Sequence, residues 1–275
     1  MTAARDEAYA LLAARLGDLI EKSQKGVLAC MPFLTPGQAR RAARILREYG
    51  AYEAAWFWGG YRGAERVCLF LLPDYLLACL PDERVPEDDD AAMLELLGED
   101  ADAAVSALRI KGSGYRVLSH RDYLGSILGL GLERDALGDI AVQNEQEAVI
   151  FCPQKLVPFL TESLEKVASD TVRCYPYRVD ETFTDGRKYA PVNDTVASAR
   201  LDCVVAALTN LSREAAQSAV RSGSVEVEFE PEERVDRILT PPAVISVRGH
   251  GRFVLRSFDG ETRKGRLRMR ADKLV

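Results

Sequence analysis

The sequence has few residues of the kind that build metal centres and no segment long enough to cross a membrane. It contains only two histidines, and its six cysteines lie far apart with no CxxC pair. Zinc binding is therefore not expected, and we predict neither a metal nor another cofactor. No apolar run approaches the ~18 residues of a membrane span. We expect a cytoplasmic protein without a membrane span, whose thiols are mostly reduced and buried.

Charge is unevenly distributed along the chain. The 275 residues carry a net charge of -6, which by itself argues against a protein coated in nucleic acid. From Ala197 onward, however, basic residues outnumber acidic ones, and from Ser246 onward nine basic residues stand against three acidic ones. A basic C-terminal region on an acidic chain indicates a local contact with a polyanion.

The first part, residues 1–98, has the pattern of an N-terminal α/β domain. Apolar residues at helical spacing predict a helix over residues 3–22, and Thr35-Pro36 caps a second helix that ends at Gly50. Two strands, at residues 54–58 and 67–72, flank a turn at Gly59-Gly60-Tyr61. The acidic segment 81–102 is expected to be a solvated linker with one weak helix.

The second part, residues 99–182, alternates strands and helices in the order βαββαβ. The predicted strands are 105–111, 139–142, 148–151 and 172–179, and the predicted helices are 121–130 and 154–168. This is the ferredoxin-like order of many RNA-recognition domains, a fold that also hosts other functions. Aromatic residues that would stack bases are not evident at the expected strand centres, so RNA binding is only suggested.

Two short helices open the third part, residues 197–275, after a polar segment at 181–196 that is predicted to be a linker. Ser212 is a good N-cap and Gly223 a good stop for the second helix. Basic and polar residues recur along it every four positions, at Arg213, Gln217 and Arg221. Periodicity leaves two interpretations open: solvated arginines, or a cationic surface whose guanidinium groups bind RNA phosphates.

The spacing of residues in this third part is more specific than its periodicity. Arg200-Leu201-Asp202 is followed by Ser212-Arg213, Ala216 and an alternating strand at 225–229. This order resembles the S4 domain, a small RNA-binding module, and so implies a C-terminal S4-type fold. The resemblance places four residues on the RNA-facing signature, namely Arg200, Asp202, Ser212 and Arg213, with Arg221 nearby. Asp202 is expected to position an arginine, because its own charge repels RNA.

The strand at 225–229 departs from that module in its charge. Ser224 and Glu228 stand where the module often has Lys and Asn, and Glu226 adds a second acidic side chain. We therefore expect the RNA surface on the two helices and on the basic C-terminal strands, with Arg248 and Arg252 among its contacts.

Further motifs occur in the first two parts of the chain. They are Phe33-Leu34-Thr35-Pro36, Gly59-Gly60-Tyr61, Ala64-Glu65-Arg66, His120-Arg121-Asp122-Tyr123-Leu124-Gly125 and Gly138-Asp139-Ile140. Together with the S4-like segment they resemble the YlmH family, which has an N-terminal, a central RNA-binding and a C-terminal S4 domain. The resemblance implies association with the large ribosomal subunit, with contacts to rRNA and peptidyl-tRNA, in bacterial ribosome-associated quality control. Genes of the family are also linked to cell division.

The segment His120-Arg121-Asp122 has two interpretations that the sequence supports equally. These residues cap the helix predicted from Arg121, or His120 and Arg121 contact RNA. The segment also matches part of the catalytic loop of protein kinases, but Ile127 stands where that loop has Asn, so a kinase is not expected.

Two functions other than ribosome rescue stay open. Arg200-Leu201-Asp202 also resembles the catalytic aspartate loop of pseudouridine synthases, but the 73 residues that follow leave no room for their catalytic domain. An RNA-modifying activity would therefore have to lie in residues 1–180. A protein-interaction adaptor in cell division would instead use the acidic N-terminal half. We expect a non-catalytic, monomeric RNA-binding protein.

Overall fold

The computed structural model describes residues 2–80, 90–180 and 182–275. Contacts within the chain divide it into two compact units, residues 1–186 (unit 1) and residues 187–275 (unit 2). The expected boundary between residues 98 and 99 falls inside unit 1. Both units mix helices with antiparallel sheets, as the α+β expectation requires.

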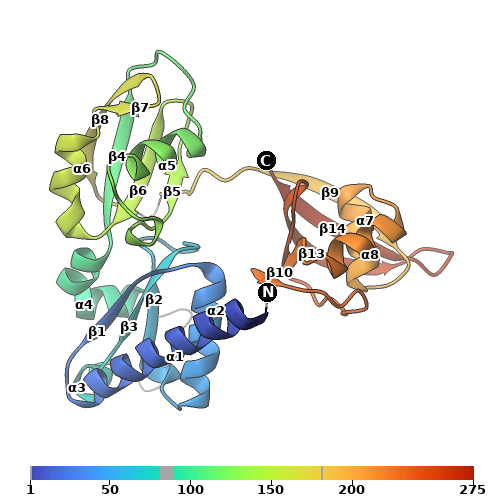
Figure 1. The fold of residues 1–275 in the computed structure, drawn as a ribbon, viewed down its shortest axis with the longest axis horizontal. Coiled ribbons are helices and arrows are strands. Elements are labelled where there is room, and N and C mark those ends of the chain that lie inside the picture. Colours follow the sequence, from blue (N-terminus) through green and yellow to red (C-terminus); the bar gives the residue numbers. More distant parts are fainter. Residues whose placement is uncertain (1, 81–89, 181) are drawn as a thin grey trace. The chain divides into compact units, whose positions relative to one another are not determined.

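The N-terminal part of unit 1 is a three-stranded sheet of order β1-β3-β2, with two long helices on one face (Figure 1). Thr35 caps the second helix as predicted, since its hydroxyl accepts a hydrogen bond from the Gln38 amide at 3.3 Å. The sequence did not predict β1, because Pro32 interrupts its strand pattern. A proline is tolerated at this position because β1 lies at the edge of the sheet. The elements are α1 (Thr2–Gln24), β1 (Ala29–Leu34), α2 (Pro36–Glu48), η1 (Tyr52–Ala54), β2 (Ala55–Trp58), β3 (Val67–Leu71) and α3 (Asp74–Leu77).

The second sheet of unit 1 contains the predicted βαββαβ elements and one further strand, β7, before the last one; the strand order is β5-β6-β4-β8-β7. Its final helix is shorter than the predicted 154–168, because Ala168 has a left-handed φ of 52° and turns the chain into the β7–β8 hairpin. The elements are β4 (Ser106–Gly112), α5 (His120–Leu128), η2 (Arg134–Ala136), β5 (Ile140–Val142), β6 (Glu147–Cys152), η3 (Gln154–Leu156), α6 (Val157–Ser163), β7 (Lys166–Val167) and β8 (Asp170–Tyr177).

A hydrophobic cluster joins the two sheets of unit 1. Trp56 and Phe70 from the first sheet belong to the same buried cluster as Phe151 from the second. The turn at Gly60 is part of this junction: its φ is +95°, and a Cβ there would lie 2.4 Å from the Phe151 ring. Glycine is therefore required at this position by both conformation and space.

The acidic segment predicted to be a linker contains a packed helix. Residues 81–89 of that segment lie outside the described residues, but α4 (Asp90–Ala104) follows them directly. Met93, Leu97 and Ala101 of α4 are buried in the cluster that joins the sheets. A weak helix was predicted here, but its assignment to a solvated linker was wrong, because the helix buries an apolar face while most of its acidic residues lie on the exposed side.

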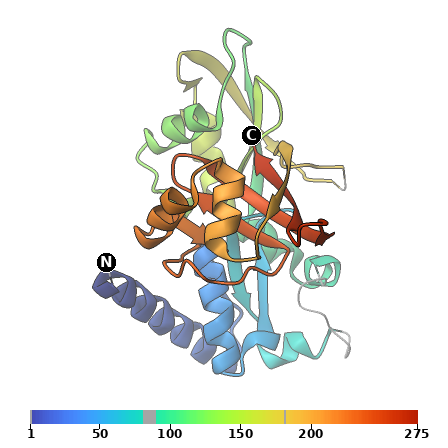
Figure 2. The same cartoon turned by 90° about the vertical axis from the view of Figure 1, so that its right-hand side faces the viewer.

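Unit 2 consists of one sheet of order β11-β10-β12-β13-β14-β9, with α7 and α8 packed on one face (Figure 2). The predicted linker at 181–196 was wrong in its second half, because residues 189–196 form the edge strand β9 and pair with β14. Pro191 is accommodated because β9 is an edge strand. The elements are β9 (Tyr189–Val196), α7 (Leu201–Thr209), α8 (Arg213–Arg221), β10 (Val225–Val227), β11 (Glu230–Pro231), β12 (Ala243–Val247), β13 (Gly251–Glu261) and β14 (Leu267–Leu274).

The six described cysteines do not form disulfides with one another. All six cysteines are free, but only three of them are buried, namely Cys68, Cys152 and Cys174. Burial raises the pKa of Cys152 to about 12 and that of Cys174 to about 11. Within residues 2–80, 90–180 and 182–275, no helix has the length and apolar character of a membrane span. The same residues contain no His, Cys, Asp and Glu cluster that could hold a metal ion.

Candidate nucleic-acid interface

A buried carboxylate organises the start of both helices of unit 2. Asp202, in the first turn of α7, is 0% exposed. Arg200, the N-cap residue of α7, donates to both of its oxygens, from Nε at 3.0 Å and from Nη2 at 3.2 Å. Arg213, the first residue of α8, donates from Nε at 3.4 Å, and Gln217 donates from Nε2 at 2.8 Å. Both carboxylate oxygens are therefore occupied by side chains of two adjacent helices.

The local sequence explains why these side chains meet. Asn210 ends α7 in the left-handed conformation, with a φ of 55°, and Ser212 begins α8 by accepting a hydrogen bond from the Ala215 amide at 3.2 Å. This tight turn places the start of α8 beside α7, where Ala216 and Val220 pack into the core. The predicted N-cap role of Ser212 is confirmed.

The electrostatics of Asp202 favour its charged form. Burial alone would raise the pKa of Asp202, but hydrogen bonds from Arg200 and Gln217 and the charge of Arg200 hold this pKa well below its usual range. The arginines are more accessible than the carboxylate, since their side chains are 33% exposed at Arg200 and 61% exposed at Arg213. The arrangement thus hides one negative charge and presents two positive ones.

A second carboxylate holds two further arginines beside α7. Glu232 accepts from Arg234 through both oxygens at 3.0 Å and from Arg237 Nη1 at 2.7 Å. The hydrogen bonds from Arg234, with those from Arg237, lower the pKa of Glu232 to about 2. The backbone of this segment lies along the start of α7, because the Leu201 amide donates to the Arg237 carbonyl at 2.8 Å. Sequence reasoning missed Arg234 and Arg237, although the close Glu-Arg spacing was a signal for such a pair.

The remaining basic residue of the helix face is Arg221. It ends α8, two turns after Arg213, and is exposed. The four-residue spacing predicted that Arg213, Gln217 and Arg221 share one face. The structure agrees with that spacing, since Ala216 and Val220 form a separate, buried stripe beside this face of α8.

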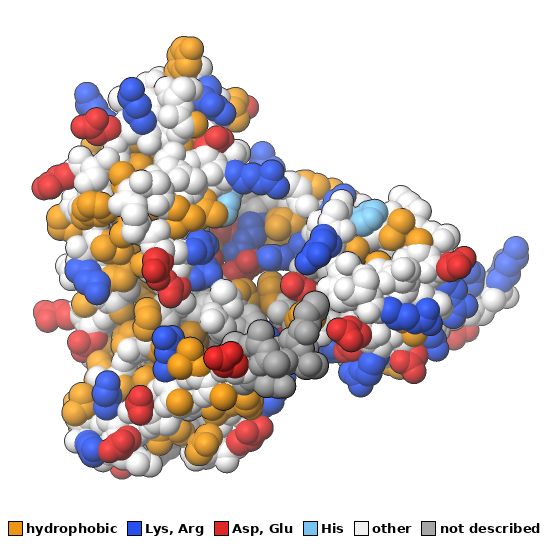
Figure 3. Space-filling view, viewed as in Figure 1, with side chains coloured by type: hydrophobic (Ala, Val, Ile, Leu, Met, Phe, Trp, Pro, Cys, Tyr) orange, Lys and Arg blue, Asp and Glu red, His pale blue; other side chains and the backbone are white. Residues whose placement is uncertain are grey.

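The basic C-terminal strands lie on a different face of unit 2 from the two helices. Arg268 and Arg270 alternate with Met269 and Ala271, which are buried against α7 and α8. Side chains alternate in a strand, so the two arginines point away from the helices. Basic side chains gather around the β13–β14 hairpin in Figure 3. The sequence prediction treated helices and strands as one RNA surface, whereas the structure separates them.

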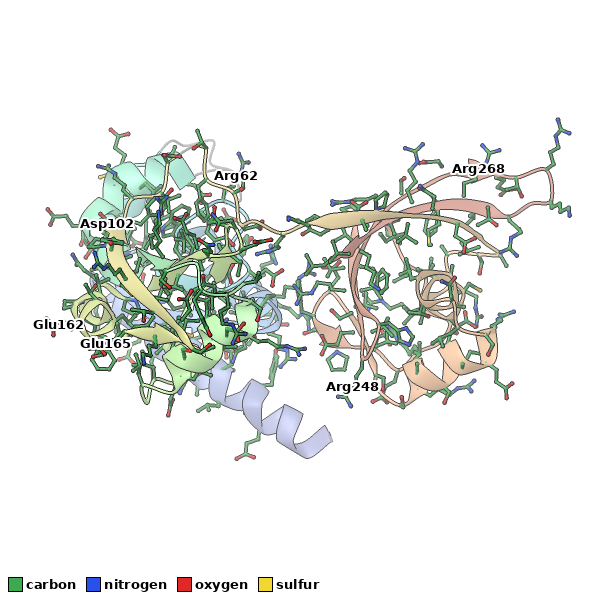
Figure 4. All side chains as sticks on the ribbon, turned by 90° about the horizontal axis from the view of Figure 1, so that it is seen from above. Arg62, Asp102, Glu162, Glu165, Arg248 and Arg268 are labelled. Carbon is green, nitrogen blue, oxygen red and sulfur yellow. The ribbon has the colours of Figure 1, made fainter. Side chains whose placement is uncertain are left out.

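Arg248 and Arg252 lie at a third place in unit 2. Arg248 follows β12, and Figure 4 shows it on the opposite side of the unit from Arg268. Together with Arg252 and Glu226 it lines a shallow cavity of about 300 Å³. The Arg252 guanidinium also lies 5.0 Å from the centre of the Phe229 ring. The acidic Glu226 therefore lies beside the two predicted RNA contacts Arg248 and Arg252.

His120 and Arg121 are in unit 1 and are exposed at the start of α5. Asp122 and Ser119 form a capping box, in which the Ser119 amide donates to Asp122 at 2.8 Å. The capping interpretation of this segment is therefore confirmed through Asp122. Partial burial of the His120 side chain disfavours its charged form, and the nearby positive charge of Arg134 acts in the same direction, so the pKa of His120 is lowered.

The other motifs of unit 1 converge on Asp139. Its carboxylate accepts from the Tyr61 hydroxyl at 2.7 Å and from the backbone amides of Glu65 at 2.7 Å and Arg66 at 3.1 Å. Arg66 then donates from Nε to the Leu137 carbonyl at 2.9 Å. Three of the motifs, at 59–61, 64–66 and 138–140, are thus joined by one hydrogen-bond network that fixes the turn after β2.

Comparisons with known proteins found three similar proteins or domains. Residues 99–181 match the family model YlmH_RBD, described as "Putative RNA-binding domain in YlmH". The chain is 29% identical over 213 residues to the "Ribosome-associated protein quality control protein P2" of Bacillus subtilis (strain 168), covering 78% of this chain and 75% of that protein. A solved structure described as "Cell division protein ylmH from Streptococcus pneumoniae" is 22% identical, with a TM-score of 0.49, covering 66% of this chain and 95% of that chain.

The family model and the curated relative point to the same group of proteins. The family model covers the second sheet of unit 1 with its helices, and the curated relative matches more than three quarters of the whole chain. The motifs at Asp139 and at the start of α5 lie within or contact the matched domain. The chain is therefore similar to proteins of the YlmH family, both in the matched domain and over most of its length.

Proposed function

We propose that this chain is a non-catalytic RNA-binding protein that associates with the large ribosomal subunit and contacts rRNA and peptidyl-tRNA during rescue of stalled translation. Unit 2 acts as an S4-type RNA-binding domain, and residues 99–182 act as a ferredoxin-like RNA-binding domain. The chain acts as a monomer. The proposal is supported by the name of the curated relative, a ribosome-associated quality-control protein.

The observation that carries the proposal is the arginine pair held by Asp202. Arg200 and Arg213 come from the starts of two helices, and one buried carboxylate fixes both. Guanidinium groups fixed in this way bind phosphate oxygens with little loss of side-chain freedom. Arg221 at the far end of α8 extends the same face. Ser212 then orients Arg213 by capping α8, and Asp202 acts by positioning arginines.

The same geometry supports a binding role over catalysis by Asp202. A catalytic aspartate needs a carboxylate oxygen within reach of its substrate. Asp202 is fully buried, and both of its oxygens accept hydrogen bonds from Arg200, Arg213 and Gln217. We therefore assign no pseudouridine synthase activity to this residue.

The decisive experiment compares two double variants that each remove two positive charges from unit 2. Arg200→Ala with Arg213→Ala changes the helix face, and Arg268→Ala with Arg270→Ala changes the opposite face of the sheet. Cell lysates are sedimented through sucrose gradients, and the chain is detected in each fraction. We expect wild type and the strand variant on large subunits and the helix-face variant at the top of the gradient.

The other outcomes contradict specific parts of the proposal. Loss of sedimentation in the strand variant alone would move the anchor from the helices to the sheet. Wild-type protein at the top of the gradient would refute ribosome association and favour the cell-division adaptor. Hydrogen exchange of residues 201–221 establishes that the helix-face variant is still folded.

Salt dependence tests the same contact in vitro. Binding through about five phosphate contacts predicts a log-log slope of affinity against salt of roughly -3 to -5. Removing Arg200 and Arg213 should make that slope less steep by about 1.4 to 1.8, because each lost phosphate contact contributes roughly 0.7 to 0.9. An unchanged slope would show that neither arginine contacts phosphate.

A further inference from the structure

The second sheet of unit 1 has one face covered by helices and one face that is partly open. Leu108, Ile110, Val172 and Cys174 point to the covered face and are buried with residues of α5 and α6. Figure 4 shows Glu162 of α6 and Asp102 of α4 on opposite sides of this sheet. The residues between the buried ones in β4 and β8 therefore face away from α5 and α6.

The strand register defines what the open face carries. In the antiparallel pair of β4 and β8, Arg109 lies opposite Tyr175, and Lys111 lies opposite Arg173. Directly opposite residues have Cβ atoms about 5 Å apart, so these side chains form one continuous patch. We call Arg109, Lys111, Arg173, Tyr175 and Tyr177 the β4–β8 patch.

The patch is exposed and is both aromatic and basic. The ring of Tyr175 is 46% exposed, and Arg173 and Lys111 are exposed beside it. The Arg109 guanidinium lies 4.2 Å from the centre of the Tyr177 ring, which holds it flat against the sheet. Lys111 also pairs with Glu147 at 3.2 Å, so part of its charge is offset.

One half of this face is accessible to a ligand, because the first sheet of unit 1 covers the other half. Val149 and Phe151 of β6 share the same face but are buried in the cluster with Trp56 and Phe70 of the first sheet. Tyr177 lies at the border and contacts Phe183, with ring centres 6.3 Å apart. The accessible ring of the patch is therefore Tyr175, with cationic groups on either side.

We propose that the β4–β8 patch binds single-stranded RNA, with one base stacked on Tyr175 and adjacent phosphates held by Arg173 and Arg109. Exposed aromatic rings among basic side chains on a sheet are the features that bind unpaired bases, because every base has a π face and every linkage a negative charge. Alternate residues of a strand are roughly 6.8 Å apart, so Arg173 and Tyr175 present a cation and a ring in succession. A duplex does not fit this patch, because its bases are already stacked.

This inference rests on the proposed RNA-binding role of residues 99–182 and deepens it, because it names the surface and the kind of RNA that this surface binds. It also revises the sequence-based expectation that base-stacking aromatics are not evident, because the strand register places Tyr175 of β8 on the open face, opposite Arg109.

The test measures binding of a fluorescein-labelled single-stranded RNA octamer to the full chain by fluorescence anisotropy. The variants are Tyr175→Ala, Tyr175→Phe and Arg173→Gln, and all are also made with Arg200→Ala and Arg213→Ala. Tyr49→Ala is the matched control, because Tyr49 is an exposed tyrosine at the end of α2. We expect Tyr175→Ala to weaken binding roughly five- to a hundredfold, the range of one lost base stack. Tyr175→Phe and Tyr49→Ala should stay within about twofold of wild type, since stacking needs only the ring.

The other results overturn the inference without ambiguity. Equal affinity of Tyr175→Ala and wild type would show that the ring does not stack a base. Octamer binding that is lost in the Arg200 and Arg213 variant but kept in Tyr175→Ala would place the single-strand site on unit 2 and leave the proposed function standing. Preference for an eight-base-pair duplex over the octamer would also refute a single-strand site.

Discussion

Replacing Asp202 with alanine separates two physical roles for the charges of unit 2. If affinity for RNA depended only on net charge, removing a negative residue would strengthen binding. If the arginines must be held in place, the same change weakens binding, because Arg200, Arg213 and Gln217 lose their shared acceptor. We expect the second result.

The magnitude follows from the burial of the carboxylate and the exposure of its partners. Removing one partner of a fully buried ion pair costs about 3–5 kcal/mol. Arg200 and Arg213 are partly exposed and regain water, so we expect a loss of about 2–3 kcal/mol in the free energy of opening α7 and α8. Freeing two ordered arginine side chains should weaken binding to large subunits by about tenfold.

Two measurements check this prediction separately. Hydrogen exchange of residues 201–221 reports the opening of α7 and α8, while fluorescence reports unit 1, which contains both Trp56 and Trp58. The tryptophan transition should be unchanged in Asp202→Ala. Binding that is tighter than wild type, or exchange that stays at the wild-type rate, would refute the positioning role of Asp202.

Three further changes test other parts of the structure. Gly60→Ala should destabilise unit 1 by about 2 kcal/mol or more, because the new Cβ would lie 2.4 Å from the Phe151 ring. Urea unfolding measures this loss, and a smaller value would mean that the ring can move. Asp139→Ala should lower the unfolding free energy of unit 1 by about 2–4 kcal/mol, since Tyr61 and two backbone amides lose their acceptor, and wild-type stability would contradict that role. The pKa of Glu232 is lowered from its usual value near 4.5, so its charged form stabilises unit 2 fully at pH values above about 4.5. This stabilisation disappears as the pH falls toward about 2. Glu232→Gln should therefore make the melting temperature of unit 2 less dependent on pH in that range, and an unchanged profile would refute the assignment.

Much of the candidate interface could be predicted from local sequence, because its signals are short-range. Ser212 was predicted to cap a helix, and the spacing of Arg213, Gln217 and Arg221 was predicted to form one face, because both depend on helical geometry alone. Arg234 and Arg237 were missed because their role depends on a backbone segment that lies along α7, far from it in sequence. The separation of Arg268 and Arg270 from the helix face likewise depends on which side of the sheet the helices cover.

The sequence by itself determined α1, α2, α5, α7 and α8, four of the five strands of the matched domain, and the residues that carry the family resemblance, since periodicity and capping act within a few residues. Tertiary structure alone decided three other features. Strand β9 forms from a polar segment because β14 supplies its hydrogen-bond partners. Tyr175 faces solvent because the N-terminal sheet covers only the β6 side of its face. Asp202 becomes a buried acceptor because α8 folds back onto α7, and only that packing brings Arg213 and Gln217 within hydrogen-bonding distance.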